Sequence, residues 1–286
     1  MEYIAENRHG NLISWRIRRP ERLNAIGLKV IAELTQLMDG LEEQCQPWRD
    51  GNAAPLKKMK RSPPLPCRLL HITADPIASS KGKIWIAGGD LKDQANFENQ
   101  SESTNYAKNV SQFCTRLEHL PIPVVVSIDG AAIGGGAELA LAGDFRYATQ
   151  ESSLHFRQLS VGLPTGFGGC QRLVESVGRS VATHILMTGG TLASPLASSL
   201  GLFHQVTQSS DHLQNAVIQL SQMIASFSPE AVATQKNMVL QAARPLRDEN
   251  LREELTLFAN TWGNPTHFQN LKNFKKQQDS MDSAKR

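Results

Sequence analysis

The sequence has 286 residues, of which 40% are hydrophobic and 20% are charged, the balance of a folded globular protein and not of a disordered or fibrous one. Its 30 Lys and Arg residues against 27 Asp and Glu residues give a net charge of +3, which does not favour a dedicated nucleic-acid binder. No stretch of about 18 apolar residues occurs, so no transmembrane helix is expected.

The N-terminus and the cysteines bear on targeting and metal binding. The N-terminus carries Glu2 and Glu6 and lacks the apolar stretch of a secretory signal. The four cysteines lie far apart and form no C-x-x-C pair: Cys45, Cys67, Cys114 and Cys170. We therefore expect a cytoplasmic protein with reduced thiols, no disulfide framework and no metal site.

In chain order, strands and helices alternate first. A turn at residues 9–11 leads into a strand over residues 12–17. Apolar residues at helical spacing then predict a helix over residues 28–44. The same alternation continues with strands over residues 68–74, 83–87, 121–128, 145–148 and 203–206, and with helices within 131–143 and over 103–117, 171–187 and 193–200. This order predicts an α/β fold with a parallel sheet.

The C-terminal part of the chain is expected to be helical throughout. Ser228 is a good helix N-cap, and Pro229 fits the first turn that follows it. Helical patterns cover residues 212–227, 229–243, 246–260 and 264–278. We therefore divide the chain into a core at residues 1–206 and a helical subdomain at residues 207–286.

Residues 46–66 interrupt the regular pattern. This stretch is rich in Pro and Lys and has no periodic apolar face. It is longer than most connections in a compact domain, so it is predicted to be a solvated insertion. A clamp for a phosphate group and an oligomer contact are the alternatives.

Two glycine-rich segments follow predicted strands, at residues 86–91 (IAGGDL) and 128–139 (IDGAAIGGGAEL). Glycine lets the backbone approach a ligand closely. The second segment opens a helix, whose first amides carry partial positive charge and can bind a developing anion. One amide from each segment would make an oxyanion hole. The alternative is two tight turns that bind no ligand.

Four co-linear segments resemble motifs of the crotonase, or enoyl-CoA hydratase/isomerase, superfamily. Residues 19–25 (RPERLNA) are similar to R-P-x-x-x-N-A, and residues 87–91 (AGGDL) to A-G-x-D-[LI]. Residues 130–144 (GAAIGGGAELALAGD) are similar to G-x-A-x-G-G-G-x-E-L-A-L-x-x-D, and residues 162–173 (GLPTGFGGCQRL) to G-x-x-x-G-x-G-G-x-x-R-L. Only residues 46–66 have no obvious counterpart.

The resemblance implies a spiral of ββα units with a C-terminal helical subdomain that forms homotrimers, and it leaves open whether trimers pair into hexamers. It implies a lyase of fatty acid metabolism whose substrate is an acyl-CoA thioester, with no cofactor besides the CoA of the substrate. The thioester carbonyl would lie between the amides of Gly89 and Gly135. The residues implied in binding CoA are Ala87, Gly89, Asp90, Leu91 and Lys92 through their backbone, and Lys275 or Lys276 at the 3′-phosphate.

The acid–base residues distinguish the reactions of this superfamily. Glu138 matches the first of the two glutamates that its hydratases use, although a first-turn Glu is also favoured by the helix dipole alone. The second glutamate falls on Gln158, and an amide does not exchange a proton near neutral pH as a carboxylate does. No acidic residue lies within residues 159–169 to replace it. Simple hydration is therefore in doubt.

Several functions stay open at this point. One is a hydratase or isomerase that uses Glu138 alone. Another is a decarboxylase of a malonyl-type CoA thioester, because Gln158 and the surroundings of Glu138 resemble the ethylmalonyl-CoA decarboxylase branch. Outside catalysis, the alternatives are RNA binding through the basic residues 57–61 and 272–276, and an inactive scaffold. The basic loop has no interleaved aromatic residues, so we do not expect a nucleic-acid partner.

Overall fold

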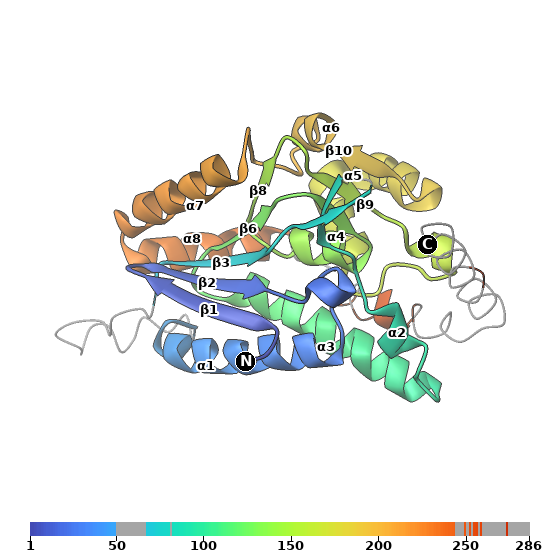
Figure 1. Ribbon diagram of the computed structural model, residues 1–286. Helices are drawn as coiled ribbons and strands as arrows, with labels where there is room; N and C mark the ends of the chain where they lie inside the picture. The colour runs from blue at the N-terminus through green and yellow to red at the C-terminus, as the bar shows by residue number, and fades with distance from the viewer. Residues whose placement is uncertain are drawn as a thin grey trace.

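The computed structural model describes residues 1–49, 67–80 and 82–243, together with residues 249, 252, 254–256, 258 and 273. The strands form two sheets, and helices lie on both sides of the larger one (Figure 1). The mixed α/β class and the parallel sheet expected from the sequence are confirmed.

The larger sheet has six strands in the order β1-β2-β3-β6-β8-β11. Its first two strands form the antiparallel hairpin expected from the sequence, and every later pair of neighbours is parallel. The strands are β1 (Ile4–His9), β2 (Leu12–Ile17), β3 (Leu69–Ala74), β6 (Val124–Ile128), β8 (Phe145–Thr149) and β11 (Gln205–Thr207).

The smaller sheet has five strands in the order β10-β9-β7-β5-β4. They are β4 (Ile77–Ser79), β5 (Gly82–Ile86), β7 (Ala131–Ile133), β9 (Ser153–His155) and β10 (Thr191–Ala193). Three successive turns of the chain each give one strand to the larger sheet, a later strand to the smaller sheet, and then a helix: β3, β5 and α3; β6, β7 and α4; β8, β9 and α5. The first of these turns also contains β4 and the short helix α2. This repeat is the spiral of ββα units that the sequence predicts.

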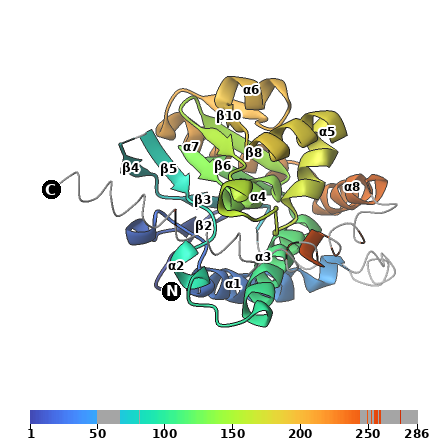
Figure 2. The same ribbon diagram turned by 90° about the vertical axis from the view of Figure 1, so that its right-hand side faces the viewer.

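Helices enclose the sheets on both sides. They are α1 (Leu28–Arg49), α2 (Leu91–Gln94), α3 (Gln100–His119), α4 (Gly135–Leu141), α5 (Gly169–Thr188), α6 (Ser194–Ser199), α7 (Ser210–Ala225) and α8 (Pro229–Ala242), with short 3-10 turns η1 (Pro20–Arg22) and η2 (Gln158–Val161). Both views show α1 beside α3 on one side of the larger sheet (Figures 1 and 2). Helix α7 packs on the opposite face, against β3, β6 and β8.

The alternation of side chains along each strand explains these two layers. Ile13, Trp15 and Ile17 of β2 belong to the main core with α1 and α3, whereas Leu12 belongs to the smaller core under α7. All five residues of β6 are buried, since this strand is covered on both faces.

The structure corrects the sequence prediction in several places. Helix α1 continues to Arg49, so residues 46–49 are not part of a loop. Pro47 lies in the last turn of α1, where the hydrogen bond that proline forfeits is one near the helix end. The other residues of the predicted insertion, 50–66, lie outside the described residues. Strands β4, β7, β9 and β10 were not predicted, because three residues are too few to show a period. Helix α6 begins at Ser194, since Ala193 ends β10.

The start of the predicted C-terminal subdomain is helical as expected. The Ser228 hydroxyl accepts a hydrogen bond from the Ala231 amide, which caps α8. The predicted helices at residues 246–260 and 264–278 fall mostly outside the described residues, and the division at residue 206 stays a prediction. Within the described residues, no helix combines the length and apolar character needed to cross a membrane.

Candidate functional site

The two glycine-rich segments meet in space. Gly89 follows β5, and Gly135 is the first residue of α4. A Cβ atom placed on Gly135 would lie 3.3 Å from the Gly89 nitrogen, and one on Gly88 would lie 3.3 Å from the Gly135 nitrogen. The amides that the sequence pairs as a possible oxyanion hole are therefore neighbours.

Both amides are free to donate. Gly135 opens a helix, and the first amides of a helix have no partner within it. Gly89 pairs with Ile26 in a short bridge, but that bridge uses the Gly88 carbonyl and the Asp90 amide. Among the residues that the structure describes, neither Gly89 nor Gly135 donates its N–H group to another backbone or side-chain atom.

The glycines are required by close contacts and backbone conformation. Gly88 and Gly134 have φ angles of 99° and 53°, which side chains other than glycine rarely adopt. A Cβ atom on Gly136 would lie 2.6 Å from the Ile86 carbonyl oxygen. A side chain on Gly135 would collide with the ring of Phe167. The sequence GGG at the start of α4 thus allows β5 and the helix to approach each other.

Glu138 lies one turn into α4 and is almost completely buried, with 2% of its surface exposed. Its carboxyl group accepts three hydrogen bonds. Oε1 accepts one from the side-chain amide of Gln158 at 2.8 Å. Oε2 accepts one from the backbone amide of Phe167 at 2.8 Å and one from that of Gly169 at 2.9 Å. These contacts fix the carboxyl group at the end of the loop over residues 162–168, which we call the Gly-rich loop before α5.

Burial raises the pKa of Glu138 to about 7, because a charged carboxylate is poorly solvated inside the protein. The negative charge of Glu254 raises it further, and the hydrogen bonds from Gln158, Phe167 and Gly169 act in the opposite direction. A carboxyl group with such a pKa is present in both protonation states near neutral pH. It is therefore suited to general acid–base work.

Gln158 occupies the position expected from the sequence, at the start of η2. Its side chain is half-buried and donates to Glu138. It therefore contacts the carboxylate directly, as a neutral donor.

The predicted CoA-binding stretch after β5 is partly used for structure. The Asp90 carboxylate is buried, caps α2 through the amides of Lys92 and Asp93, and forms an ion pair with Arg19 at 2.8 Å. Leu91 is half-buried and Lys92 is exposed. The Ala87 amide donates to the Leu23 carbonyl at 3.0 Å. Contacts of this stretch with CoA stay a prediction.

Two predicted CoA contacts, Lys275 and Lys276, lie outside the described residues. One residue that the sequence analysis did not identify is Glu254. Its carboxylate accepts hydrogen bonds from the amides of Cys170 and Gln171, next to the amide that holds Glu138. Nothing in the sequence near residue 254 could have indicated this contact, because it depends on how the C-terminal segment packs.

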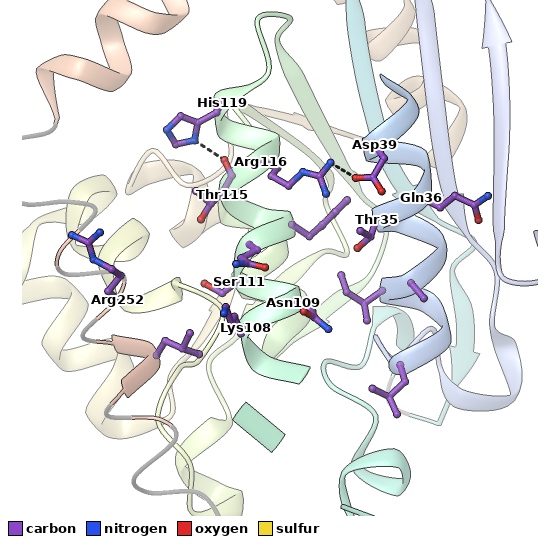
Figure 3. Close-up of a pocket in the computed structure, with 16 residues that line it drawn as sticks. Thr35, Gln36, Asp39, Lys108, Asn109, Ser111, Thr115, Arg116, His119 and Arg252 are labelled. Carbon is purple, nitrogen blue, oxygen red and sulfur yellow. Dashed lines mark hydrogen bonds and ion pairs between the residues drawn. The ribbon is translucent and has the colours of Figure 1, made fainter. Parts of the chain in front are cut away.

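A separate cavity of about 1120 Å³ lies between α1, α3 and the C-terminal residues Arg252 and Leu255. Figure 3 shows polar side chains of α3, including Lys108, Ser111 and Thr115, along one of its walls. This cavity is not lined by Gly89, Gly135 or Glu138. We choose the two amides and Glu138 as the candidate active site, because two unpaired N–H donors and a carboxyl group with a raised pKa belong to it.

The described part of the chain holds no group of three or more His, Cys, Asp and Glu side chains that could bind a metal ion. The polar groups of the site are backbone amides, one carboxyl group and one carboxamide. This arrangement can stabilise an oxyanion and transfer a proton next to it.

Comparisons with known proteins find similar families, chains and folds. A family model for enoyl-CoA hydratase/isomerase matches residues 76–280. The chain is 30% identical over 226 residues to enoyl-CoA isomerase/hydratase fer4 of Mycosarcoma maydis, covering 79% of this chain and 75% of that protein. It is 33% identical over 199 residues to ethylmalonyl-CoA decarboxylase of Gallus gallus, covering 68% of this chain and 66% of that protein. The crystal structure of an enoyl-CoA hydratase/isomerase from Xanthobacter autotrophicus Py2 has the same fold, with a TM-score of 0.79 at 19% identity over 96% of this chain and 93% of that one.

Proposed function

Because the chain belongs to the enoyl-CoA hydratase/isomerase family, we propose that it forms and protonates the enolate of an acyl-CoA thioester at the Gly89, Gly135 and Glu138 site. The observation that carries this proposal is the pair of adjacent, unpartnered amides beside a buried carboxyl group.

The two amides serve the oxygen of the thioester. When the thioester becomes an enolate, negative charge collects on this oxygen. Two preorganised N–H donors stabilise that charge without reorganising, and each lowers the activation free energy by about 3 kcal/mol. The positive end of the α4 dipole adds to the contribution of Gly135.

Glu138 transfers the proton. Its pKa of about 7 leaves a large fraction of the group protonated at neutral pH, so it can act as an acid. Gln158 donates to Oε1 and keeps the group oriented, while having no proton to exchange itself. The site thus has one acid–base group among its identified members.

The reaction that one such group supports best is decarboxylation of a substituted malonyl-CoA. The carbon–carbon bond to the substrate carboxylate breaks, CO₂ leaves, and the bonding electrons form the enolate. Protonated Glu138 then gives its proton to the α-carbon and regains one from water. The similarity to ethylmalonyl-CoA decarboxylase of Gallus gallus supports this choice.

Hydration or isomerisation of an enoyl-CoA is the second candidate. The similarity to the isomerase/hydratase of Mycosarcoma maydis favours it. These reactions also pass through an enolate, so the same amides would serve. Hydration in addition requires that Glu138 handle both the water and the α-proton.

One mass-spectrometric assay distinguishes the two candidates. The protein is given crotonyl-CoA and ethylmalonyl-CoA together, with Glu138→Gln as the inactive control. We expect CO₂ to be lost from ethylmalonyl-CoA and crotonyl-CoA to remain unchanged. Addition of water to crotonyl-CoA would instead make the protein a hydratase. If neither compound changes and neither binds, the proposed substrate class is wrong.

The variant Gln158→Glu tests whether residue 158 is the reason that we expect no hydration. It places a second carboxyl group next to Glu138, as the hydratases of the superfamily have. If residue 158 alone limits hydration, this variant gains hydration of crotonyl-CoA. A variant that folds and binds crotonyl-CoA but adds no water contradicts this explanation.

The backbone of residues 87–92 and the lysines at 275 and 276 are proposed to bind the CoA part of the substrate. The homotrimer, its pairing into hexamers and the cytoplasmic location remain predictions from the sequence.

A further inference from the structure

The first turn of α5 holds two carboxyl groups side by side. The amide of Gly169, the first residue of α5, donates to Glu138 at 2.9 Å. The next two amides, of Cys170 and Gln171, donate to the two oxygens of Glu254 at 3.3 Å and 3.2 Å. Three successive amides at one helix N-terminus thus serve two acidic residues from distant parts of the chain.

Packing holds the Glu254 segment in this place. Phe258, one helical turn after Glu254, is buried with 4% of its surface exposed. A Cβ atom on Gly166 would lie 2.5 Å from the Phe258 ring, so the segment rests directly on the Gly-rich loop before α5. Leu255 packs against the same core. The Gly-rich loop therefore carries Glu138 on one side and the Glu254 segment on the other.

Glu254 is the charged neighbour of Glu138 in this environment. The other titratable groups that face Glu138 are Tyr106 and Cys114 on α3 and Cys170 on α5. Burial raises the pKa of all three, that of Cys114 to about 12, so they are uncharged near neutral pH.

One buried cation, Arg172 of α5, interacts with Glu254 through its charge. Its guanidinium donates to Glu118, at 2.8 Å and 3.0 Å, and to the Phe167 carbonyl at 2.6 Å. Like charge close to a carboxyl group favours the protonated form of that group. The charge of Glu254 acts on Glu138 in this direction.

We propose that Glu254 is a positioning residue for Glu138: it accepts hydrogen bonds from Cys170 and Gln171 and so fixes the first turn of α5, whose Gly169 amide holds the Glu138 carboxyl group, and it places a negative charge beside that group. The consequence for catalysis rests on the proposed function, in which Glu138 is the proton donor. The effect on the titration of Glu138 does not depend on the proposed function.

The test is a direct titration of Glu138 in the full chain. The carboxyl ¹³C signal of labelled glutamate is followed by NMR between about pH 4 and about pH 9, and the Glu138 signal is assigned by its loss in Glu138→Gln. Glu254→Gln keeps the size and one acceptor but removes the charge. We expect this variant to lower the titration midpoint of the Glu138 carboxyl group by about one pH unit. Glu249→Gln is the matched control, because Glu249 belongs to the same part of the chain and is exposed.

Three outcomes decide the proposal. An unchanged Glu138 midpoint in a folded Glu254→Gln protein overturns it. An equal shift in the Glu249→Gln control overturns it as well, because the effect would then be general. If Glu254→Gln does not fold, Glu254→Asp keeps the charge and should keep the raised midpoint, so a Glu138 that titrates in the usual range in that variant also overturns the proposal.

Turnover gives an independent readout. If the protein acts on an acyl-CoA, the alkaline limb of the kcat profile should move to lower pH in Glu254→Gln by the same amount as the NMR midpoint, with KM unchanged. Loss of activity with an unmoved limb would indicate a purely structural role and contradict the proposal. If no acyl-CoA is turned over by the wild-type protein, the proposed function fails while the NMR result still decides the role of Glu254.

Discussion

The carboxyl group of Glu138 is buried and accepts three hydrogen bonds, and these two conditions act on its pKa in opposite directions. The donors stabilise the carboxylate, whereas burial and Glu254 stabilise the neutral acid. Burial is the larger effect, so the pKa is raised. The donors then orient a group that remains an acid near neutral pH.

This balance predicts how stability depends on pH. Glu138 titrates near 4.5 when unfolded and at about 7 when folded, so the folded state binds more protons between these values. Its contribution to stability is therefore fully present below about pH 4.5 and is lost as the pH rises to about 7, by on the order of 3 kcal/mol. Urea unfolding at a series of pH values measures this decrease. The Glu138→Gln protein should lack this component, and an identical pH dependence in both proteins would contradict the raised pKa.

A second prediction at the residue scale concerns the Gly135 amide. Gly135→Pro removes the N–H group, and proline is otherwise tolerated at the first position of a helix. We expect kcat on the substrate found by the mass-spectrometric assay to fall about 10²- to 10³-fold. Gly135→Ala is the matched control, since it places a Cβ atom against Phe167 in the same way but keeps the amide. Equal losses in the two variants would show that crowding, and not the amide, matters.

At the scale of elements, one buried lysine joins α8 to the spiral. The Lys236 ammonium donates to the carbonyls of Leu117 and Ile122, at 3.2 Å and 3.0 Å, and to the Asp144 carboxylate at 2.7 Å. Its three donors are thus all used, at the end of α3, just before β6 and just before β8. This contact fixes the beginning of the C-terminal helical region on the core.

We predict that Lys236→Met destabilises the protein by about 3 kcal/mol, because it leaves Asp144 without its cation. Thermal or urea unfolding measures the loss, and Lys108→Met, at an exposed lysine of α3, is the control. Adding Asp144→Asn should restore part of the stability, because the remaining group is then uncharged. A single variant as stable as the wild type would show that the buried pair contributes nothing net.

At the scale of the whole molecule, α7, α8 and the turn between them expose several large apolar side chains. Met223, Phe227, Met238 and Val239 are each more than half exposed, with Val239 at 62%. An exposed apolar surface of this kind is typical of an interface. If these residues form the predicted trimer contact, light scattering after size exclusion should give three times the monomer mass, and Met238→Glu with Val239→Glu should reduce it. A wild-type monomer would contradict the prediction.

The resemblance to the crotonase superfamily implied the ββα spiral and the place of Gln158 near Glu138. The glycine-rich segments after two predicted strands were themselves enough to suggest that the amides of Gly89 and Gly135 act together. The sequence could not predict Glu254, which reaches the site only through tertiary packing of Phe258 on the Gly-rich loop. The sequence pattern also ends the first helix too early, at residue 44, because the Pro-rich stretch begins with Pro47, which lies in the last turn of α1.

The pairing of β5 with β7 sets the distance between the two free amides. Ile84 lies opposite Ala131 and Ile86 opposite Ala132, with a register irregularity between Ile84 and Ile86. Gly89 and Gly135 each follow the second of these pairs by a few residues. Removing one residue from β5 would move Gly89 by about 3.3 Å along the strand. That shift is as large as a hydrogen bond is long, so the two donors would no longer converge on one oxygen atom. The spacing of the two backbone amides proposed to bind the oxyanion is thus determined by strand register.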